Sequence, residues 1–359
     1  MTCDAKPRFA YVGSYTSKER KGQGKGISVY GIDPATEKWN LAHVVPADNA
    51  TFLCFDKTKR FLYSCQADGS LVSAYAVNET TGALTLLNTR AGNGKNGVHI
   101  LPDPGNKFII VVSSVVDVFP RNEDGSLGPC CCTIVPEGGF GPLKEQVVYC
   151  PHQGVFDKSG KYLLVPDKFL DGIHILRFDA ASGKLAYHDP ACVRARPGAG
   201  QRHLDWHPEK PFAYVMDEND NTVTTWQWDA AKGSLTPLQW VSSIPGTYFN
   251  PVKGGRDYGS GEIWVAPSGR FVYGSNRGHD SIVIYAVDEV SGLLNLVGWE
   301  SSRGATPRFF CLSADGTRLF AANLNGHNIV MFSVDGNTGK LTPTGQEVAV
   351  GSPCCILFL

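Results

Sequence analysis

Short runs of alternating apolar and polar residues, each bounded by turn residues, recur along the whole chain. The clearest example spans residues 261–298. β-Branched and aromatic runs separated by Pro, Ser, Gly, Asn and Asp are typical of strands joined by tight turns. This stretch therefore predicts four short strands, at residues 263–265, 271–275, 281–288 and 293–298.

The same succession of strands and turns occurs in six copies, which begin near residues 52, 98, 152, 202, 261 and 308. Successive starts are roughly 46 to 60 residues apart, a spacing that suits four-stranded propeller blades with insertions. Apolar strands at both ends of the chain remain after these copies are assigned. They lie at residues 9–14, 26–30 and 39–41, and at residues 353–359.

These observations predict an all-β fold: a seven-bladed β-propeller with four antiparallel strands in each blade. We expect one domain over residues 1–359, in which the N-terminal strands and residues 353–359 share one blade. Pairing of the two ends would close the ring and remove its open sheet edges.

Three segments depart from the repeat. Residues 108–119 lack the polar loop between the middle strands, so we expect either a distorted blade or a different register there, in a copy that ends at residues 124–127. Residues 129–150 and 240–261 are long insertions before the next inner strands.

Composition adds few constraints. A formal net charge of -1 provides no electrostatic argument for a nucleic-acid or membrane partner. No signal segment follows residues 1–8, and no apolar run is long enough to span a bilayer. Eleven cysteines, several of them contiguous, suit neither a disulfide framework nor paired zinc ligands, so we expect reduced thiols in a cytoplasmic protein.

The charged residues that differ between copies indicate a site. Because successive strands are antiparallel, the start of the first strand and the end of the second lie at the same edge, around the channel. A scaffold position repeats one residue type, whereas these positions carry different charged groups. They are His152, Arg202, Arg308, His203 and Glu262 at the strand starts, and Lys168, Asp217, Glu218, Asn276 and Arg277 at the strand ends.

Each of these residues also has a purely structural interpretation. His152 could bond a loop carbonyl, Arg202 and Arg277 could form solvated ion pairs, and Glu218 could be their counter-ion. Such roles would leave no catalytic group at the channel.

Two of the strand-end residues favour the structural interpretation. Asp217 and Asn276 are expected to bond loop amides, as Asx residues do at turns, and to support the site from behind. His279 and His327 each follow a Gly in the same position of two copies, which is typical of scaffold residues.

The residue types predict the chemistry. A carboxylate beside arginines stays ionised and can act as a general base, while an imidazole can take or supply a second proton. Arginines bind carboxylate or phosphate bidentately and stabilise an oxyanion. No metal-binding or serine-nucleophile motif is present. We therefore expect a small anionic substrate, acyl or proton-transfer chemistry, no metal and no cofactor.

Several motifs resemble one known family, the lactonase family of seven-bladed propellers, over about residues 9–358. They are Pro151-His152-Gln153, Gln201-Arg202-His203, Asp217-Glu218-Asn219, Ser275-Asn276-Arg277-Gly278-His279-Asp280-Ser281 and Thr306-Pro307-Arg308. That family includes bacterial 6-phosphogluconolactonases and fungal carboxy-cis,cis-muconate cyclases. The resemblance implies a metal-independent enzyme of carbohydrate metabolism whose catalytic residues are His152, Arg202, Glu218 and Arg277.

One departure bears on the substrate. Many family members carry a second histidine two residues after the first, where this chain has Gly154. Lactones of other sugar acids or acids therefore stay open beside phosphogluconolactone.

Three functions follow from these predictions. The first is a lactonase acting in the central channel, in which Glu218 or His152 activates water and Arg202 and Arg277 hold the substrate and the oxyanion. The second is a cycloisomerase of the muconate cyclase type. The third is a non-catalytic scaffold, which the single Trp-Asp pair at residues 228–229 does not favour because repeats of the WD type need one in each blade.

Overall fold

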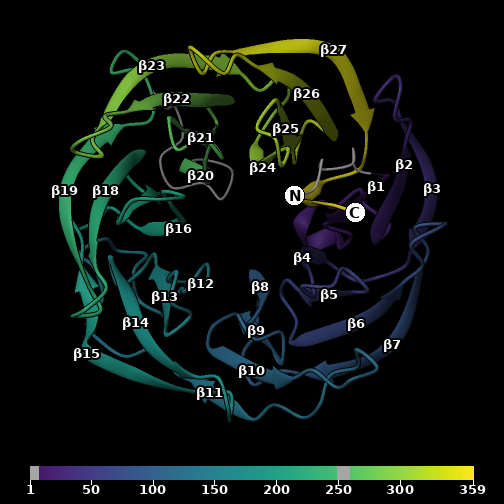
Figure 1. Cartoon of the computed structure of the whole chain (residues 1–359), viewed down its shortest axis with the longest axis horizontal. Coiled ribbons are helices and arrows are strands. Elements are labelled where there is room, and N and C mark those ends of the chain that lie inside the picture. Colours follow the sequence, from purple (N-terminus) through teal and green to yellow (C-terminus); the bar gives the residue numbers. More distant parts are fainter. Residues whose placement is uncertain (1–7, 249–258) are drawn as a thin grey trace.

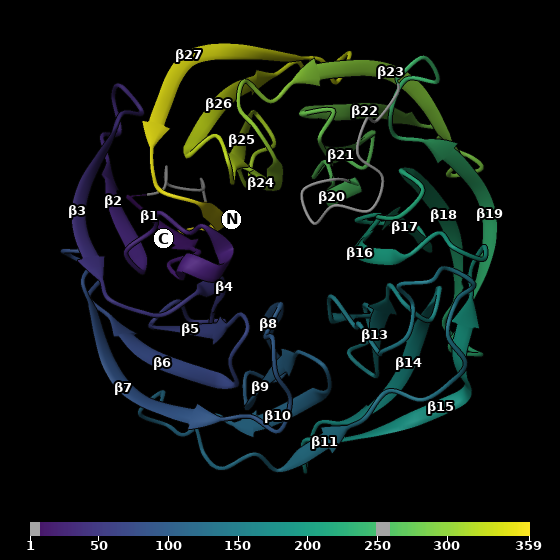
Figure 2. The same cartoon turned by 180° about the vertical axis from the view of Figure 1, so that it is seen from behind.

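The protein is a ring of β-sheets around a central channel. The computed structural model describes residues 8–248 and 259–359, and within them seven four-stranded antiparallel sheets surround the channel (Figure 1). The view from behind shows the same ring (Figure 2). The predicted seven-bladed β-propeller is confirmed.

The strands of each blade are given from the channel outward. One blade contains β28 (Pro353–Phe358), β1 (Phe9–Ser14), β2 (Ile27–Ile32) and β3 (Trp39–Val45). The next contains β4 (Ala50–Phe55), β5 (Phe61–Gln66), β6 (Leu71–Val77) and β7 (Leu84–Ala91). It is followed by β8 (His99–Pro102), β9 (Phe108–Val112), β10 (Val116–Pro120) and β11 (Cys132–Ile134).

The other four blades follow in chain order. They are β12 (Val155–Phe156), β13 (Tyr162–Asp167), β14 (Gly172–Asp179) and β15 (Lys184–Arg194); β16 (Gln201–Trp206), β17 (Phe212–Asp217), β18 (Thr222–Asp229) and β19 (Ser234–Ser242); β20 (Gly259–Val265), β21 (Phe271–Arg277), β22 (Ser281–Val287) and β23 (Leu294–Ser301); and β24 (Pro307–Leu312), β25 (Arg318–Asn323), β26 (Asn328–Val334) and β27 (Leu341–Ala349). A short 3-10 helix, η1 (Lys18–Arg20), lies between β1 and β2.

The two ends of the chain close the ring. β1 pairs with β28 in antiparallel register, with Tyr11 opposite Leu357 and Val12 opposite Ile356. The predicted shared blade is therefore confirmed, since β28 pairs with β1 along one edge and β1 pairs with β28 and β2 along both of its edges.

The distorted blade is complete but differs from its prediction. β9 and β10 are joined by only three residues, 113–115, and its outer strand is the three-residue β11. Leu127, where this copy was expected to end, forms an isolated bridge with Arg121. The outer strand thus lies inside the predicted insertion at 129–150. The insertion predicted at 240–261 lies partly outside the described residues.

Neighbouring blades are joined at the repeated turn glycines. The buried Tyr214 hydroxyl of β17 donates a hydrogen bond to the Gly292 carbonyl of the next blade at 2.9 Å, and Tyr273 of β21 does the same to Gly339 at 2.9 Å. Gly292 has φ +71°, and a Cβ there would lie 2.5 Å from the ring of Phe212. The glycine therefore serves both the turn and the contact between blades.

The rest of the interior is apolar. Clusters of buried residues fill the spaces between adjacent blades, and Trp226 is fully buried in one of them. The ten cysteines in the described part of the chain are free thiols, as predicted. Over the same residues, no helix has the length and apolarity needed to cross a bilayer.

Replacing Gly292 with alanine tests the contact between blades. Gly292→Ala places a side chain in the left-handed region against Phe212, so we expect the free energy of unfolding to fall by about 1–3 kcal/mol. Urea denaturation measures this change. Gly336→Ala, in the β26–β27 turn where a Cβ would meet nothing within 4 Å, should leave the midpoint almost unchanged. Equal midpoints for both variants would contradict the assigned role of Gly292.

Candidate active site

Charged side chains from several blades meet at one mouth of the channel. The ends of the paired strands coincide, since Gln201 lies opposite Asp217 and Gly259 lies opposite Arg277. We call the following side chains the rim site: His152, which precedes β12; Lys168, which follows β13; Arg202 in β16; Glu218, which follows β17; Arg277 at the end of β21; and Arg308 in β24.

Glu218 is the centre of the charge cluster. Its Oε1 lies 2.7 Å from Nζ of Lys168 and 3.1 Å from Nη2 of Arg277, and its Oε2 lies 2.9 Å from Nε of Arg202. The three cations come from three adjacent blades. One carboxylate therefore ties together three separate sheets at the mouth of the channel.

The same contacts set the ionisation of Glu218. Burial by itself raises the pKa of this carboxyl, but the positive charges of Arg277, Lys168 and Arg202 outweigh it and hold the pKa well below its usual range. Glu218 thus stays ionised at any physiological pH. A carboxylate held this strongly is a poor proton acceptor, because its conjugate acid is disfavoured.

The arginines are also fixed by the backbone. Nη1 of Arg202 donates to the Gly261 carbonyl at 2.6 Å, and Nη2 of Arg277 donates to the Ser260 carbonyl at 2.9 Å. Both side chains are buried. The guanidinium groups are therefore held in place before any substrate arrives, which is the condition for electrostatic stabilisation of a developing charge.

A second group of buried side chains forms a hydrogen-bonded chain. Nδ1 of His152 lies 3.0 Å from Nε2 of His203, and Nδ1 of His203 lies 2.7 Å from Oε1 of Glu262. All three residues are buried. The chain runs from the rim site into the channel interior.

Burial controls the protonation of this chain. It lowers the pKa of both His152 and His203 well below the ordinary value, and the charge of Arg202 lowers them further. Burial also raises the pKa of Glu262 to about 7. Both histidines are therefore neutral, and Glu262 can exchange a proton near neutral pH.

In six of the seven blades, two successive residues near the start of the inner strand, or just before it, line the channel. The first of each pair faces the rim site, and the second contributes to a layer across the channel that we call the belt. The belt consists of Phe52, His99, Gln153, His203, Glu262 and Phe309. Its rings are in contact, with centroids 4.4 Å apart for Phe52 and His99 and 5.9 Å apart for Phe52 and Phe309.

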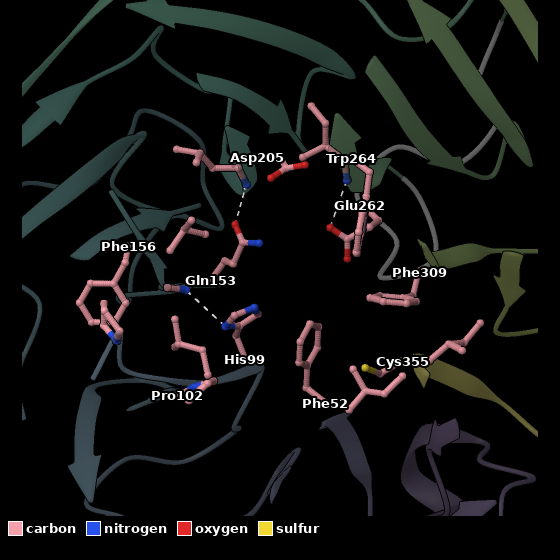
Figure 3. Close-up of a pocket in the computed structure, with 18 of the residues that line it drawn as sticks. Phe52, His99, Pro102, Gln153, Phe156, Asp205, Glu262, Trp264, Phe309 and Cys355 are labelled. Carbon is pink, nitrogen blue, oxygen red and sulfur yellow. Dashed lines mark hydrogen bonds between the residues drawn. The ribbon is translucent and has the colours of Figure 1, made fainter. Parts of the chain in front are cut away.

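The belt separates two chambers. The large chamber has a volume of ≈ 430 Å³ and is lined mostly by apolar residues, with His99, Gln153, Asp205 and Glu262 among them (Figure 3). The small chamber has a volume of ≈ 10 Å³ and lies between His152, Arg202 and Arg308. A volume of that size holds about one water molecule. Glu262 borders both chambers.

The larger chamber is the weaker candidate for an anionic substrate. Among the residues that line it, Lys57 is the only one with a permanent positive charge. The rim site instead offers arginine donors that are already oriented, next to a neutral imidazole. Charge and hydrogen-bonding capacity therefore favour the small chamber, together with the channel mouth above it, as the place where an anionic substrate would bind.

Two predicted site residues lie behind the rim. Asp217 accepts hydrogen bonds from Gln201, Thr222 and Thr224 at 3.0, 2.9 and 2.6 Å, and burial raises its pKa to about 7. Asn276 exchanges hydrogen bonds with Ser243 at 2.7 Å. Adjacent strand residues point to opposite faces, so each faces away from its charged neighbour in sequence, Glu218 or Arg277.

Four belt residues were not singled out as site residues from the sequence, and one of them, Gln153, appeared only within a family motif. Phe52, His99 and Phe309 occupy the position that His203 and Glu262 occupy in other copies. Position in the repeat was the signal that could have identified them. His99 was obscured because its copy is the irregular one, and the two phenylalanines resemble ordinary core residues.

The described residues contain no cluster of three or more His, Cys, Asp or Glu side chains arranged to hold a metal ion. The Glu218 contacts are all to cations, and Glu262 is engaged by a single imidazole. Neither carboxylate is grouped with other acidic or imidazole ligands in the way a divalent cation requires.

Fold and site together define a β-propeller with a buried, charged cluster at one channel mouth. The family described as "Lactonase, 7-bladed beta-propeller" matches residues 9–358. The chain belongs to this lactonase family.

Individual relatives match over nearly their whole length. The chain is 34% identical over 360 residues to the 6-phosphogluconolactonase of Bacillus subtilis (strain 168), covering 98% of both. It is 30% identical over 363 residues to the 6-phosphogluconolactonase of Formosa agariphila, covering 97% of this chain and 99% of that one. The structure of the periplasmic gluconolactonase PpgL of Pseudomonas aeruginosa matches with a TM-score of 0.87 at 28% identity, covering 98% of both chains.

Because PpgL is periplasmic, family membership does not fix the compartment of this chain. The cytoplasmic location stays a prediction.

Replacing Glu218 tests its role at the centre of the cluster. Glu218→Gln leaves three cations without their counter-charge, so we expect the free energy of unfolding at neutral pH to fall by about 3 kcal/mol or more. The pKa of Glu218 in the folded protein lies below its value of about 4.3 in the unfolded chain. The free energy of unfolding of the wild type should therefore exceed that of the variant above a pH of about 4.3, and this difference should be lost as the pH falls further.

Urea denaturation of both proteins from neutral pH downward measures this difference. Glu209→Gln, at an exposed glutamate, should match the wild type throughout. A Glu218→Gln deficit that stays constant down to low pH would contradict the ionic role.

Proposed function

We propose that the protein is a lactonase that hydrolyses a small anionic sugar-acid lactone at the rim site, without a metal or cofactor. One observation carries this proposal: a neutral, buried imidazole, that of His152, lies beside fixed arginines at a chamber large enough for one water molecule. That combination supplies a base, a place for the nucleophile and oxyanion stabilisation together.

His152 is the better of the two candidate bases. Both carboxylate oxygens of Glu218 are engaged by cations, which leaves neither of them free to accept a proton from water. Nδ1 of His152 is engaged by His203, whereas its Nε2 has no hydrogen-bond partner among the described residues. Glu218 then serves as the counter-ion that positions Lys168, Arg202 and Arg277.

The arginines and Lys168 are assigned to binding the substrate. Nη1 and Nε of Arg202 contact Gly261 and Glu218, which leaves its second terminal nitrogen for the carbonyl oxygen or a substrate anion. Arg308 lies over the ring of Tyr15, with 5.6 Å to the centroid, and borders the small chamber. Asn276 and Asp217 support the strand ends, and His203 and Glu262 support His152.

The reaction follows from these positions. Water attacks the lactone carbonyl carbon while Nε2 of His152 takes one of its protons, and Arg202 stabilises the oxyanion that forms. The intermediate collapses with cleavage of the ring C–O bond. The leaving alkoxide takes the proton back from His152, and the product is an open-chain hydroxy acid.

The relatives support a sugar-acid substrate. Two matching proteins are named 6-phosphogluconolactonases and a third is a gluconolactonase. Gly154, where the chain departs from many family members, borders the large chamber, and a side chain there would meet Val112 and Leu101. The departure therefore alters the chamber below the belt and leaves the rim cluster intact, so 6-phosphogluconolactone stays among the candidate substrates.

Turnover of lactones by the His152 variant tests the proposal. Acid release from aldonolactones and 6-phosphogluconolactone is followed at constant pH, with the spontaneous rate subtracted. We expect His152→Ala to lower kcat/KM by about 10²- to 10⁴-fold, because the general base is lost. His279→Ala, whose imidazole bonds Ser281 at 2.6 Å outside the rim site, should keep wild-type turnover.

Other outcomes separate the alternatives. Loss of ultraviolet absorbance from a conjugated muconate, with no lactone hydrolysed, would replace this proposal with the cycloisomerase. Turnover of neither class by the wild type would leave the non-catalytic scaffold.

A further inference from the structure

The Glu262–His203–His152 chain crosses the belt from one chamber to the other. Glu262 borders the large chamber, in which its carboxyl group faces the space between Phe309 and Gln153 (Figure 3). His152 borders only the small chamber. The two hydrogen bonds of 3.0 and 2.7 Å between them form a continuous path through otherwise tightly packed aromatic and amide side chains.

The protonation of Glu262 fixes which nitrogen of each histidine carries the proton. When Glu262 is ionised, His203 must donate from Nδ1 to Oε1, so its Nε2 accepts from Nδ1 of His152. Nε2 of His152 then carries a lone pair and can act as a base. When Glu262 is protonated and donates to His203, every bond in the chain reverses, and Nε2 of His152 carries a proton.

We propose that Glu262 is a positioning residue that acts through His203, switching His152 between the base form and the acid form and serving as the final acceptor of its proton. The inference rests on the proposed lactonase function for its catalytic consequence. The hydrogen-bonded geometry that carries it is independent of the substrate.

The relay consists of three proton transfers that leave the number of protons on each histidine unchanged. A proton taken from water by Nε2 of His152 allows Nδ1 of His152 to pass its proton to Nε2 of His203, and Nδ1 of His203 to pass its own to Glu262. The carboxylate becomes a neutral acid and both imidazoles stay neutral. Collapse of the intermediate reverses the three transfers and returns the proton to the leaving alkoxide.

Burial favours this path over a stored imidazolium. A charged imidazole at His152 would lie close to Arg202 and Arg308 in a buried site, which disfavours it. Moving the proton to Glu262 instead neutralises a buried negative charge. Several charged or titratable groups face Glu262 from the surrounding strands: His203, Arg202 and Asp205 on β16, His99 on β8, Arg308 and Cys311 on β24, and Cys355 on β28.

The large chamber supplies a route for slow exchange of this proton. Because Glu262 borders it, protonation at the belt can equilibrate from the mouth opposite the rim site. The arrangement therefore separates the side on which the lactone binds from the side on which Glu262 titrates.

Kinetics of Glu262 variants test the proposal. In Glu262→Gln the amide cannot take up the proton, so we expect kcat to fall by about 10²-fold or more while KM changes little. In the wild type kcat should rise as pH increases through about 7, where Glu262 ionises. This rise, the acidic limb of the pH profile of kcat, should disappear in the variant. Glu262→Asp, which keeps a carboxylate, should recover part of kcat and restore the limb.

Asp205→Asn is the matched control. Asp205 is a carboxylate that borders the same chamber, and burial raises its pKa to about 7, but it accepts from the backbone amides of Trp206 and Val265. Its replacement should leave the pH profile unchanged. Wild-type kcat and an unaltered acidic limb in Glu262→Gln, while His152→Ala is inactive, would overturn the relay and leave the lactonase proposal standing.

Nitrogen-15 NMR of the histidine side chains tests the relay without any substrate. As pH falls from about 9 to about 5, His203 and His152 should change together from Nδ1–H to Nε2–H tautomers in the wild type. In Glu262→Gln each should keep one tautomer throughout. Constant tautomers in the wild type, or the same change in the variant, would overturn the relay even if no substrate is found.

Discussion

The buried carboxylate of Glu218 is the interaction on which the site depends. It lies within 2.7 to 3.1 Å of cations from three neighbouring blades. Without it, Lys168, Arg202 and Arg277 would repel one another in a region poor in water. With it, each cation is held at the channel mouth, and the cost of burying charge is met by contacts that also orient the guanidinium groups. Pairing in this way keeps Glu218 ionised and removes it as a base, which leaves proton transfer to His152.

The propeller explains why such a cluster can exist. Every blade places the start of its inner strand and the end of its second strand at the same mouth, so residues far apart in sequence converge there. The scaffold is maintained elsewhere, by turn glycines and buried tyrosines between blades. The rim positions are therefore free to vary from blade to blade, and the belt below them separates a polar chamber from a largely apolar one.

Much of this could be predicted from the sequence, because both the blades and the rim follow from a repeat. Equivalent positions identified His152, Arg202, Glu218 and Arg277, and the structure brings all four to one mouth. The outer strand β11 could not be predicted, since three residues of Cys-Thr-Ile carry no periodic signal. The partners of Asp217 and Asn276 also differ from the loop amides that were expected, because side chains of Thr224 and Ser243 come close to them only in the folded sheets.

The most direct test is a crystal structure of the protein with a bound aldonate, the product of lactone opening. The account predicts that the ligand lies at the rim site, with an oxygen within hydrogen-bonding distance of Nε2 of His152 and another on Arg202. A ligand in the large chamber below the belt, among Phe156, Trp264 and Lys57, would contradict it.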